Sequence, residues 1–130
     1  MPTPLVLPVT FLEATTGIYS FPLVDERGTS IAAGEVETLT LTLADLDSNE
    51  LLNGRDKQDI LNTNDGTITT AGSPPVTTVT LQLQPEDTVI LNQHRLVEYR
   101  VLVFTWTWDL GRHTATHAVQ CAVENVPHVP

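Results

Sequence analysis

The chain contains one cysteine, Cys121, so it cannot form an internal disulfide. Small secreted domains often depend on disulfides, and their absence here favours folding in a reducing cytosol. Cys121 lies in "HAVQCAVEN", where it shares an alternating face with Val119 and Val123. We therefore expect a buried and unreactive thiol rather than a nucleophile.

Basic residues are also scarce. Six Lys and Arg stand against sixteen Asp and Glu, which gives a formal net charge of -10. Such a chain would be repelled by a phosphate backbone or an anionic membrane, so we expect neither as its main partner. No apolar run approaches the roughly 18 residues of a membrane span. The N-terminal stretch "MPTPLVLPVTFLE" lacks the basic region of a signal peptide.

Recognisable catalytic motifs are missing as well. The sequence has no G-x-S-x-G elbow, no glycine-rich phosphate loop and no Cys–His pair in a known family context. Glu86 and Asp87 are adjacent in a predicted turn, whereas the two acids of a glycosidase face each other across a cleft. We therefore predict no catalytic residues, no cofactor and no enzymatic activity.

The chain is instead rich in short segments that alternate between apolar and polar residues. "TLTLTL" places Leu39, Leu41 and Leu43 on one face, and "VTLQLQ" does the same with Val79, Leu81 and Leu83. This period of two, with many threonines, predicts half-buried strands. "IYSFPLV" is a third candidate, and Pro22 within it indicates an edge strand.

The longest apolar segment is "LVEYRVLVFTWTW", residues 96–108, whose pattern changes phase. Val97 and Tyr99 share a face opposite Glu98 and Arg100, but the large residues then move to even positions as far as Trp108. Either a bulge near residues 101–103 or burial of both faces would produce this change. Trp106 and Trp108 would share one face, as part of the core or as an exposed platform for sugars; we favour the core. After the turn "DLGR", a further strand completes a hairpin.

Turn signals separate these segments, and helical signals are weak. "RDKQDILN" suggests one or two helical turns, and "PEDTVIL" suggests one turn that begins at Pro85. About seven strands at regular spacing predict an all-β fold, an antiparallel β-sandwich. We place an extended N-terminal arm in residues 1–12 and the single sandwich domain in residues 13–130.

The stretch "ADLDSNELLNGRD" resembles a calcium loop in part. Asp45, Asp47 and Asn49 occupy positions 1, 3 and 5, and Asp56 occupies position 12. A calcium loop of the EF-hand type needs glycine at position 6 and a bidentate glutamate at position 12, and neither is present. We therefore predict a hairpin turn whose acids face water, with a weak calcium site as the alternative.

Two histidines four residues apart invite a zinc interpretation. His113 and His117 would chelate a metal from a helix, but this segment reads as a strand, where they are roughly 13 Å apart. His94 and His128 have no predicted relation in space. We therefore expect solvated or packed imidazoles and no metal site.

One segment carries a resemblance to immunoglobulin domains. "TLQLQPEDTVI", Thr80 to Ile90, is similar to the segment that joins their fifth and sixth strands across the end of the sandwich. The tyrosine and cysteine that follow this turn in the family are absent here. The resemblance implies an immunoglobulin-like corner and no antigen binding.

A looser resemblance covers most of the chain. The order "TLTLTLADLDSNELLNGRDKQDILN", then "LQPEDT", then "YRVLVFTWTWDLGRHTATHAVQCAVENVPHV" resembles small accessory proteins of tailed bacteriophages. Those proteins are immunoglobulin-like sandwiches attached to the capsid, neck or tail. The resemblance implies a virion protein made in the host cytoplasm, with other virion proteins as partners and a homo-oligomer within the assembly.

The function we expect is therefore structural: a capsid decoration (cement) protein, or a neck or tail accessory, that acts by adhesion. The alternative is a binding module that recognises a cell-surface glycan or protein. We expect the N-terminal arm to make the contact through apolar residues and strand addition, stiffened by prolines. The same segment has a second interpretation as the first strand of the sandwich. The candidate contact residues are Leu5, Val6, Leu7, Val9 and Phe11.

Overall fold

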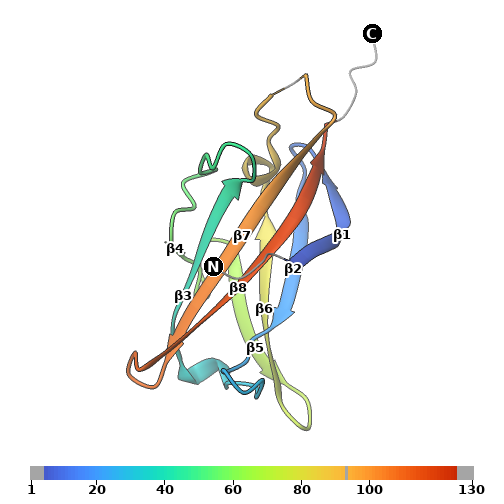
Figure 1. Cartoon of the computed structure of the whole chain (residues 1–130). Coiled ribbons are helices and arrows are strands. Elements are labelled where there is room, and N and C mark those ends of the chain that lie inside the picture. Colours follow the sequence, from blue (N-terminus) through green and yellow to red (C-terminus); the bar gives the residue numbers. More distant parts are fainter. Residues whose placement is uncertain (1–4, 93, 126–130) are drawn as a thin grey trace.

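A computed structural model describes residues 5–92 and 94–125, with side chains from Thr10 onward. The architecture is all-β, with two single-turn 3-10 helices (Figure 1). None of the described residues forms a helix long and apolar enough to cross a membrane. The elements are β1 Leu5–Leu12, β2 Gly17–Pro22, η1 Ala33–Glu35, β3 Val36–Asp45, β4 Gln58–Asp59, β5 Gly66–Ala71, β6 Val76–Leu83, η2 Pro85–Thr88, β7 Val97–Trp108 and β8 His113–Glu124.

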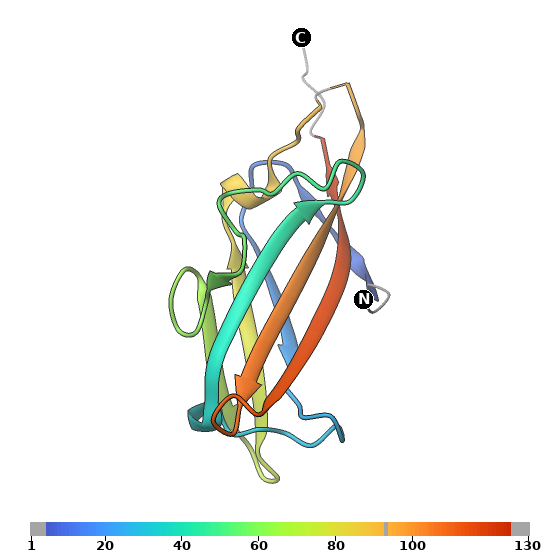
Figure 2. The same cartoon turned by 60° about the vertical axis from the view of Figure 1, so that its left-hand side comes forward.

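The strands form two sheets. The large sheet has the order β1-β8-β7-β3-β4, and the small sheet has the order β2-β6-β5. Figure 2 shows β3, β7 and β8 side by side in front of the small sheet. Buried residues of both sheets meet in one hydrophobic core. The described part of the chain thus has eight strands rather than about seven, and the parallel pairing of β1 with β8 makes the large sheet mixed rather than antiparallel.

The alternating segments form strands as predicted. Leu39, Leu41 and Leu43 of β3 are buried, as are Val79, Leu81 and Leu83 of β6. Pro22 ends β2, an edge strand, as its sequence indicated. The hairpin β7–β8 and the single turn that begins at Pro85 are also present. The predicted helical turns in residues 55–62 are wrong, because this segment instead pairs with β3 through the two residues of β4.

The predicted bulge in residues 101–103 is wrong. β7 pairs with β3 and β8 without a register shift over this stretch. The alternative of burial on both faces is also wrong, because only one face of β7 is buried. Even-numbered residues face the core along the whole strand, so Glu98 and Arg100 are buried together with Leu102 and Phe104. The apparent change of phase in the sequence arises because two charged residues, Glu98 and Arg100, occupy core positions.

Residues 5–12 of the N-terminal segment form β1. This agrees with the second interpretation of the segment, as the first strand of the sandwich. Leu5 pairs with Val119, and after a register shift Phe11 pairs with Val123. Phe11 is buried in the core, where its ring packs against Gly17 so closely that a Cβ there would collide with it. A side chain in this position offers little surface to a partner.

Candidate functional site

The outward side of the large sheet has no charged residue over Thr38–Ala44 of β3, Tyr99–Thr107 of β7 and Thr114–Ala122 of β8. The pairing register places three rows of side chains next to one another on this side. We call this surface the large-sheet face. It consists of Thr38, Thr40, Thr42 and Ala44 from β3, Tyr99, Val101, Val103, Thr105 and Thr107 from β7, and Thr114, Thr116, Ala118, Gln120 and Ala122 from β8.

The same alternation that buries the leucines of β3 directs its threonines outward. Threonine favours strands because its branched side chain fits the pleated surface. Hydroxyl groups on the face pair across strands: Thr38 with Thr107 at 2.6 Å between the oxygens, and Thr105 with Thr116 at 3.4 Å. These pairs use part of the hydrogen-bonding capacity of the face internally, which makes the surface less dependent on water.

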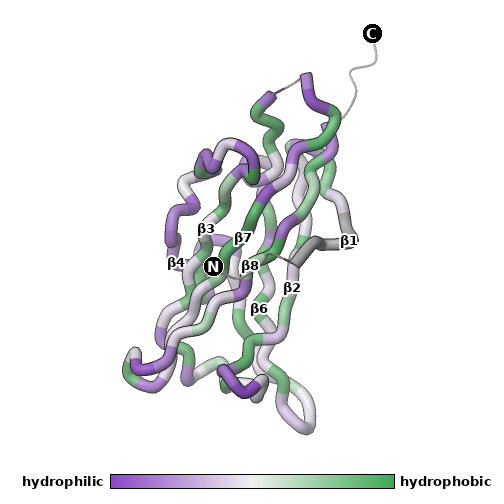
Figure 3. Tube along the Cα trace, in the orientation of Figure 1, coloured by the Kyte–Doolittle hydropathy of each residue, from purple (hydrophilic) through white to green (hydrophobic). Residues whose placement is uncertain are grey.

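Exposed charges are confined to the loops and to the margins of the large sheet. Among the described residues of that sheet, they are Glu37 at the start of β3, Asp59 in the short edge strand β4 and Glu124 at the end of β8. Figure 3 shows the hydrophilic colours gathered in the loops at both ends and beside β4, while the lower parts of β3 and β7 are pale. The exposed charges of the large sheet therefore lie at the ends of its long strands and at the β4 edge, where Asp59 pairs with Thr40.

The large-sheet face has a shallow hollow of about 470 Å³. Thr40, Thr42, Asp56, Lys57, Val103 and Thr105 line it, so its two charges, at the β4 margin, are of opposite sign. Tyr99 lies on the same face of β7, four residues before Val103, and 43% of its surface is exposed. Aromatic residues are enriched in the cores of protein–protein interfaces.

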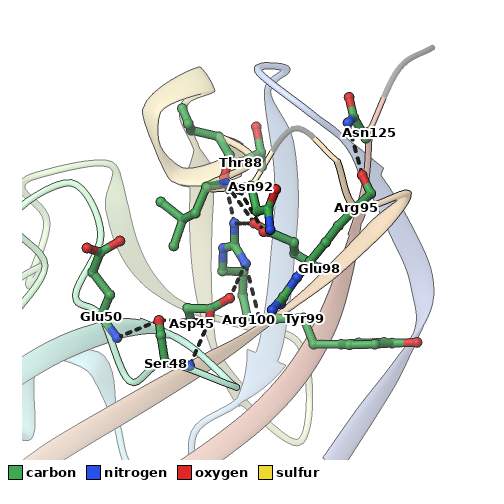
Figure 4. Close-up of polar contacts among 12 residues, drawn as sticks. Asp45, Ser48, Glu50, Thr88, Asn92, Arg95, Glu98, Tyr99, Arg100 and Asn125 are labelled. Atoms are coloured by element: carbon green, nitrogen blue, oxygen red, sulfur yellow. Dashed lines mark hydrogen bonds and ion pairs between the residues drawn. The ribbon is translucent and has the colours of Figure 1, made fainter.

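A buried cluster of three charged residues lies at the end of the sheet, beneath Tyr99. Arg100 donates from Nη1 to Asp45 Oδ1 at 2.7 Å, and from Nη2 to Glu98 Oε1 at 2.7 Å (Figure 4). Nη2 also donates to the carbonyl oxygen of Val89 at 2.6 Å, while Nε has no hydrogen-bond partner among the described residues. The cluster ties β3, β7 and the segment after η2 together.

Both acids of this cluster remain ionised. Burial raises the pKa of Asp45. Hydrogen bonds from the N–H and hydroxyl of Ser48, together with the Arg100 charge, lower it by more than burial raises it, so the pKa lies below its ordinary value. Burial likewise raises the pKa of Glu98. The bonds from Arg100 and from the backbone N–H groups of residues 91–92 outweigh it, and the pKa lies below the ordinary value.

A second buried cation clamps the corner at η2. Arg55 donates from Nε to Asp87 Oδ1 at 2.6 Å and from Nη2 to Asp87 Oδ2 at 2.9 Å, and Nη2 also reaches Asp65 Oδ2 at 3.0 Å. Burial lowers the pKa of Arg55, but the two carboxylates raise it above its ordinary value. Asp87 is buried and Glu86 is exposed, so the two do not face each other as a catalytic pair would.

No local sequence signal identifies the Arg55 cluster. Arg55 lies in a segment whose sequence suggests helical turns, and its carboxylate partners are ten and 32 residues away. For Glu98 and Arg100 a signal did exist. Extending the even-numbered phase of Leu102 to Trp108 backwards along β7 places both residues in the core.

The loop that resembled a calcium site is a turn between β3 and the segment that leads to β4, as predicted. The N–H of Asp45 donates to the carbonyl oxygen of Glu50, and Asn49 adopts a positive φ of 59°. One part of the prediction is wrong: Asp45 faces the core and Arg100, not water. Asp47 is exposed and pairs with Arg95 at 2.9 Å. Among the described residues, no group of three or more His, Cys, Asp or Glu is placed to hold a metal ion.

The two strand histidines pack against aromatic rings. His117 stacks on Phe21 with ring centroids 4.4 Å apart, and its Nε2 lies 2.6 Å from the hydroxyl of Tyr19. Burial lowers the pKa of His117. His113 stacks on Trp108 at 5.3 Å. The histidines thus serve as packed imidazoles, the default that the strand assignment indicated.

Trp106, Trp108 and Cys121 are in the core, as the sequence predicted. Trp106 is 3% exposed and donates from Nε1 to the carbonyl oxygen of Val24 at 3.2 Å, and Trp108 is 8% exposed. Neither ring presents a face for a sugar to stack on, so nothing here favours the glycan-binding alternative. Burial raises the pKa of the Cys121 thiol to about 11, which leaves it protonated and unreactive at neutral pH.

The candidate contact residues of the N-terminal segment fall into two groups. Leu5, Val6, Leu7 and Val9 belong to β1, but their side chains lie outside the described part of the chain. Phe11 is described and packs in the core. Among the side chains of this segment that the structure describes, those of Thr10 and Leu12 are exposed at the edge of the large sheet, beside β8.

Comparisons with family models, with curated proteins and with solved structures find no match for this chain. The chain's own surface therefore carries the functional assignment.

Proposed function

We propose that this chain is a non-enzymatic structural protein that acts by protein–protein adhesion. The observation that carries the proposal is the large-sheet face, an uncharged surface rich in Thr, Val and Ala on a chain of net charge -10. A charged surface keeps a protein apart from its neighbours, whereas an uncharged, partly apolar one allows close contact with them. Such a surface suits a protein whose task is attachment.

The proposed architecture is an immunoglobulin-like β-sandwich. In that fold two sheets pack face to face, and one of them gains two further strands in the variable type, the first of which lies beside the third strand of that sheet. Here β2, β6 and β5 correspond to one sheet, and β8, β7 and β3 to the other, with β4 in the place of the first added strand. The η2 turn at Pro85–Thr88 follows the sequence resemblance in the corner between β6 and β7. These correspondences support the immunoglobulin-like assignment.

The proposed setting is the virion of a tailed bacteriophage, where the chain would be a capsid decoration (cement) protein or a neck or tail accessory. Capsid or tail subunits would be its partners, and synthesis would take place in the host cytoplasm. The resemblance of its sequence to such accessory proteins motivates this setting. Many copies on a repeating lattice would add avidity to a weak individual contact.

The N-terminal segment is a second proposed contact. Leu5, Val6, Leu7 and Val9 are apolar residues of β1, the edge strand of the large sheet, which pairs with β8 on one side. An edge strand is the part of a sheet to which a partner's strand adds. Phe11 is left out of this contact because it is buried in the core.

The composition of particles tests the proposal. Particles released by cells that carry the encoding genome would be purified on a density gradient and analysed by mass spectrometry. We expect the chain to co-migrate with the capsid or tail proteins at a fixed stoichiometry. If it remains in the soluble fraction while complete particles form, the virion assignment is wrong.

A further inference from the structure

We propose that His117 is a pH-sensitive switch between the two sheets: the contact of β8 with β2 opens when its imidazole gains a second proton. We call this contact the seam. It consists of Tyr19 and Phe21 from β2 and His117 from β8. Three observations carry the inference, which does not depend on the proposed adhesive function. They are the way in which β2 and β8 are joined, the aromatic packing of the imidazole, and the hydrogen bond that one of its nitrogens makes.

Side chains, and not paired backbones, join β2 to β8. In the described part of the chain β2 pairs with β6, whereas β8 pairs with β7 and β1. β1 covers β8 from Val119 to Glu124, so residues 113–118 have no described strand on the side opposite β7. Figure 1 shows β1 beside the upper part of β8. Local opening of the seam therefore breaks no described ladder bond.

His117 reaches into the seam from the N-terminal half of β8. Its ring stacks on that of Phe21, with centroids 4.4 Å apart and planes inclined by 20°. The ring of Tyr19 lies 6.0 Å away and almost parallel, at 8°. The Tyr19 hydroxyl is 2.6 Å from Nε2, so it donates to this nitrogen when the imidazole is neutral and carries its proton on Nδ1. This hydrogen bond connects the two sheets.

A second proton works against these contacts. Both nitrogens of an imidazolium are donors, so Nε2 can no longer accept the proton of Tyr19. The charge would lie against the ring of Phe21, and none of the ion pairs among the described residues includes His117. Burial accordingly lowers the pKa of His117. The closed seam therefore favours the neutral imidazole, and protonation favours the open seam.

The groups around His117 keep their charge over the range in which it titrates. Tyr19 faces it from β2, and Cys121 lies four residues further along the same face of β8. Burial raises the pKa of Tyr19 and raises that of Cys121 to about 11, so both stay neutral below about pH 8. From β7, Phe104 faces the imidazole with its ring, and Arg100, opposite Cys121, is held by its own two carboxylates. Among the described groups at the seam, His117 is thus the one whose charge changes between about pH 5 and 7.

His113 provides a matched comparison on the same strand. It lies four residues before His117 on the same face of β8 and also stacks on an aromatic ring, that of Trp108 at 5.3 Å. It differs in its polar neighbours, because Glu26 lies 3.4 Å from Nδ1 and Asp109 lies 3.6 Å from Nε2. A proton added to His113 therefore meets carboxylates. His113→Gln is the control, since it removes an imidazole that is not part of the seam.

NMR of the intact chain across the acid range tests the inference. The ring signals of His117 give its titration midpoint, which we expect below the value of about 6.5 of an unperturbed histidine. A neutral gadolinium chelate shows whether the seam opens, because it relaxes exposed ring protons. The ring of Phe21, 5% exposed, should be relaxed more strongly as the pH falls from about 7.5 to 5, whereas that of Phe104, 0% exposed, should not change. The open fraction should increase about tenfold for each unit by which the midpoint of His117 lies below about 6.5.

Variants assign this response to His117. His117→Gln has no ionisable group at this position and should remove the acid response of the Phe21 ring, whereas His113→Gln should keep it. Tyr19→Phe keeps the stacked ring and removes the hydroxyl, so the midpoint of His117 should rise towards about 6.5 and the acid response should weaken. Far-UV circular dichroism at neutral pH shows whether each variant is folded, and Tyr19→Phe decides the question if His117→Gln is not.

Three results would overturn the inference. A midpoint of His117 at or above about pH 6.5 would show that the aromatic rings stabilise the charged form. An unchanged relaxation of the Phe21 ring over the acid range would show that the seam stays closed. An equal acid response in His117→Gln and in the unmodified chain would assign the response to another group.

Discussion

Arg100 and Asp45 lie directly opposite each other in the pairing of β7 with β3, and Arg100 Nη1 donates to Asp45 Oδ1 across 2.7 Å. Both side chains are at least 95% buried. An ion pair at a core position fixes the register of the two strands, because any shift would leave each charge without its partner. The same cluster anchors Tyr99, which points away from the core on the large-sheet face.

Arg100→Met should destabilise the protein strongly. The change removes the cation that pairs with the buried carboxylates of Asp45 and Glu98, and breaking a buried pair in this way costs about 3–5 kcal/mol. The free energy of unfolding in urea measures the effect. Arg112→Met, at an exposed turn position, is the control and should change it by less than about 0.5 kcal/mol. Similar values for the two variants would contradict the cluster's structural role.

The free energy of unfolding should decrease as the pH falls below about 5. The pKa values of Asp45 and Glu98 are lower in the folded state than their ordinary values near 4, so the unfolded chain binds protons first as the pH decreases. Their contribution is complete above about pH 5 and is lost as the pH falls through the folded-state values. Urea midpoints measured at a series of pH values should decline more steeply for the unmodified chain than for Arg100→Met. Parallel pH profiles would show that the cluster does not set this dependence.

Sequence patterns predict the strands well wherever apolar and polar residues alternate without exception. Leu39, Leu41 and Leu43 identify β3 and its inward side from the sequence alone. The pattern fails at Glu98 and Arg100, because a charged residue is assumed to face water unless its partner is known. That partner, Asp45, is 55 residues away and cannot be identified from local sequence.

Only part of the candidate contact surface can be predicted from the sequence. The outward threonines of "TLTLTL" are evident, but their significance depends on which strands lie beside them. The register places Val103 of β7 between Thr42 of β3 and Ala118 of β8, and this long-range pairing creates an uncharged surface across the three strands. The apolar N-terminal segment, by contrast, is contiguous in the chain and is therefore evident from the sequence.

Cys121 should react slowly with thiol reagents in the native protein. It is 3% exposed, and burial raises its pKa to about 11, so little thiolate is available. Labelling with a maleimide or disulfide reagent should be fast only in denaturant. Thr114→Cys supplies an exposed thiol on the same strand as an internal control. Equal labelling rates for the two thiols in the native variant would contradict the assigned phase of β8.

Gly66→Ala should destabilise the fold. A Cβ at this position, at the start of β5, would collide with the backbone carbonyl oxygen of Ile60, and backbone cannot move aside as a flexible side chain can. Forcing an extra carbon into such a site costs about 1–3 kcal/mol. Gly34→Ala is the control, since a Cβ there meets no atom within 4 Å. Thermal unfolding compares the two variants, and equal melting temperatures would contradict the packing of β5 against residue 60.

If the chain acts by adhesion, the large-sheet face is covered in the associated protein. Methyl NMR in the presence of a neutral, soluble gadolinium chelate measures this directly, because the chelate relaxes exposed methyl groups. Ile18, 69% exposed on the small sheet, is the reference. We predict that the relaxation enhancement of the Val101 and Val103 methyl groups falls as protein concentration rises, while that of Ile18 stays constant. An equal response of all three residues at every concentration would contradict the claim.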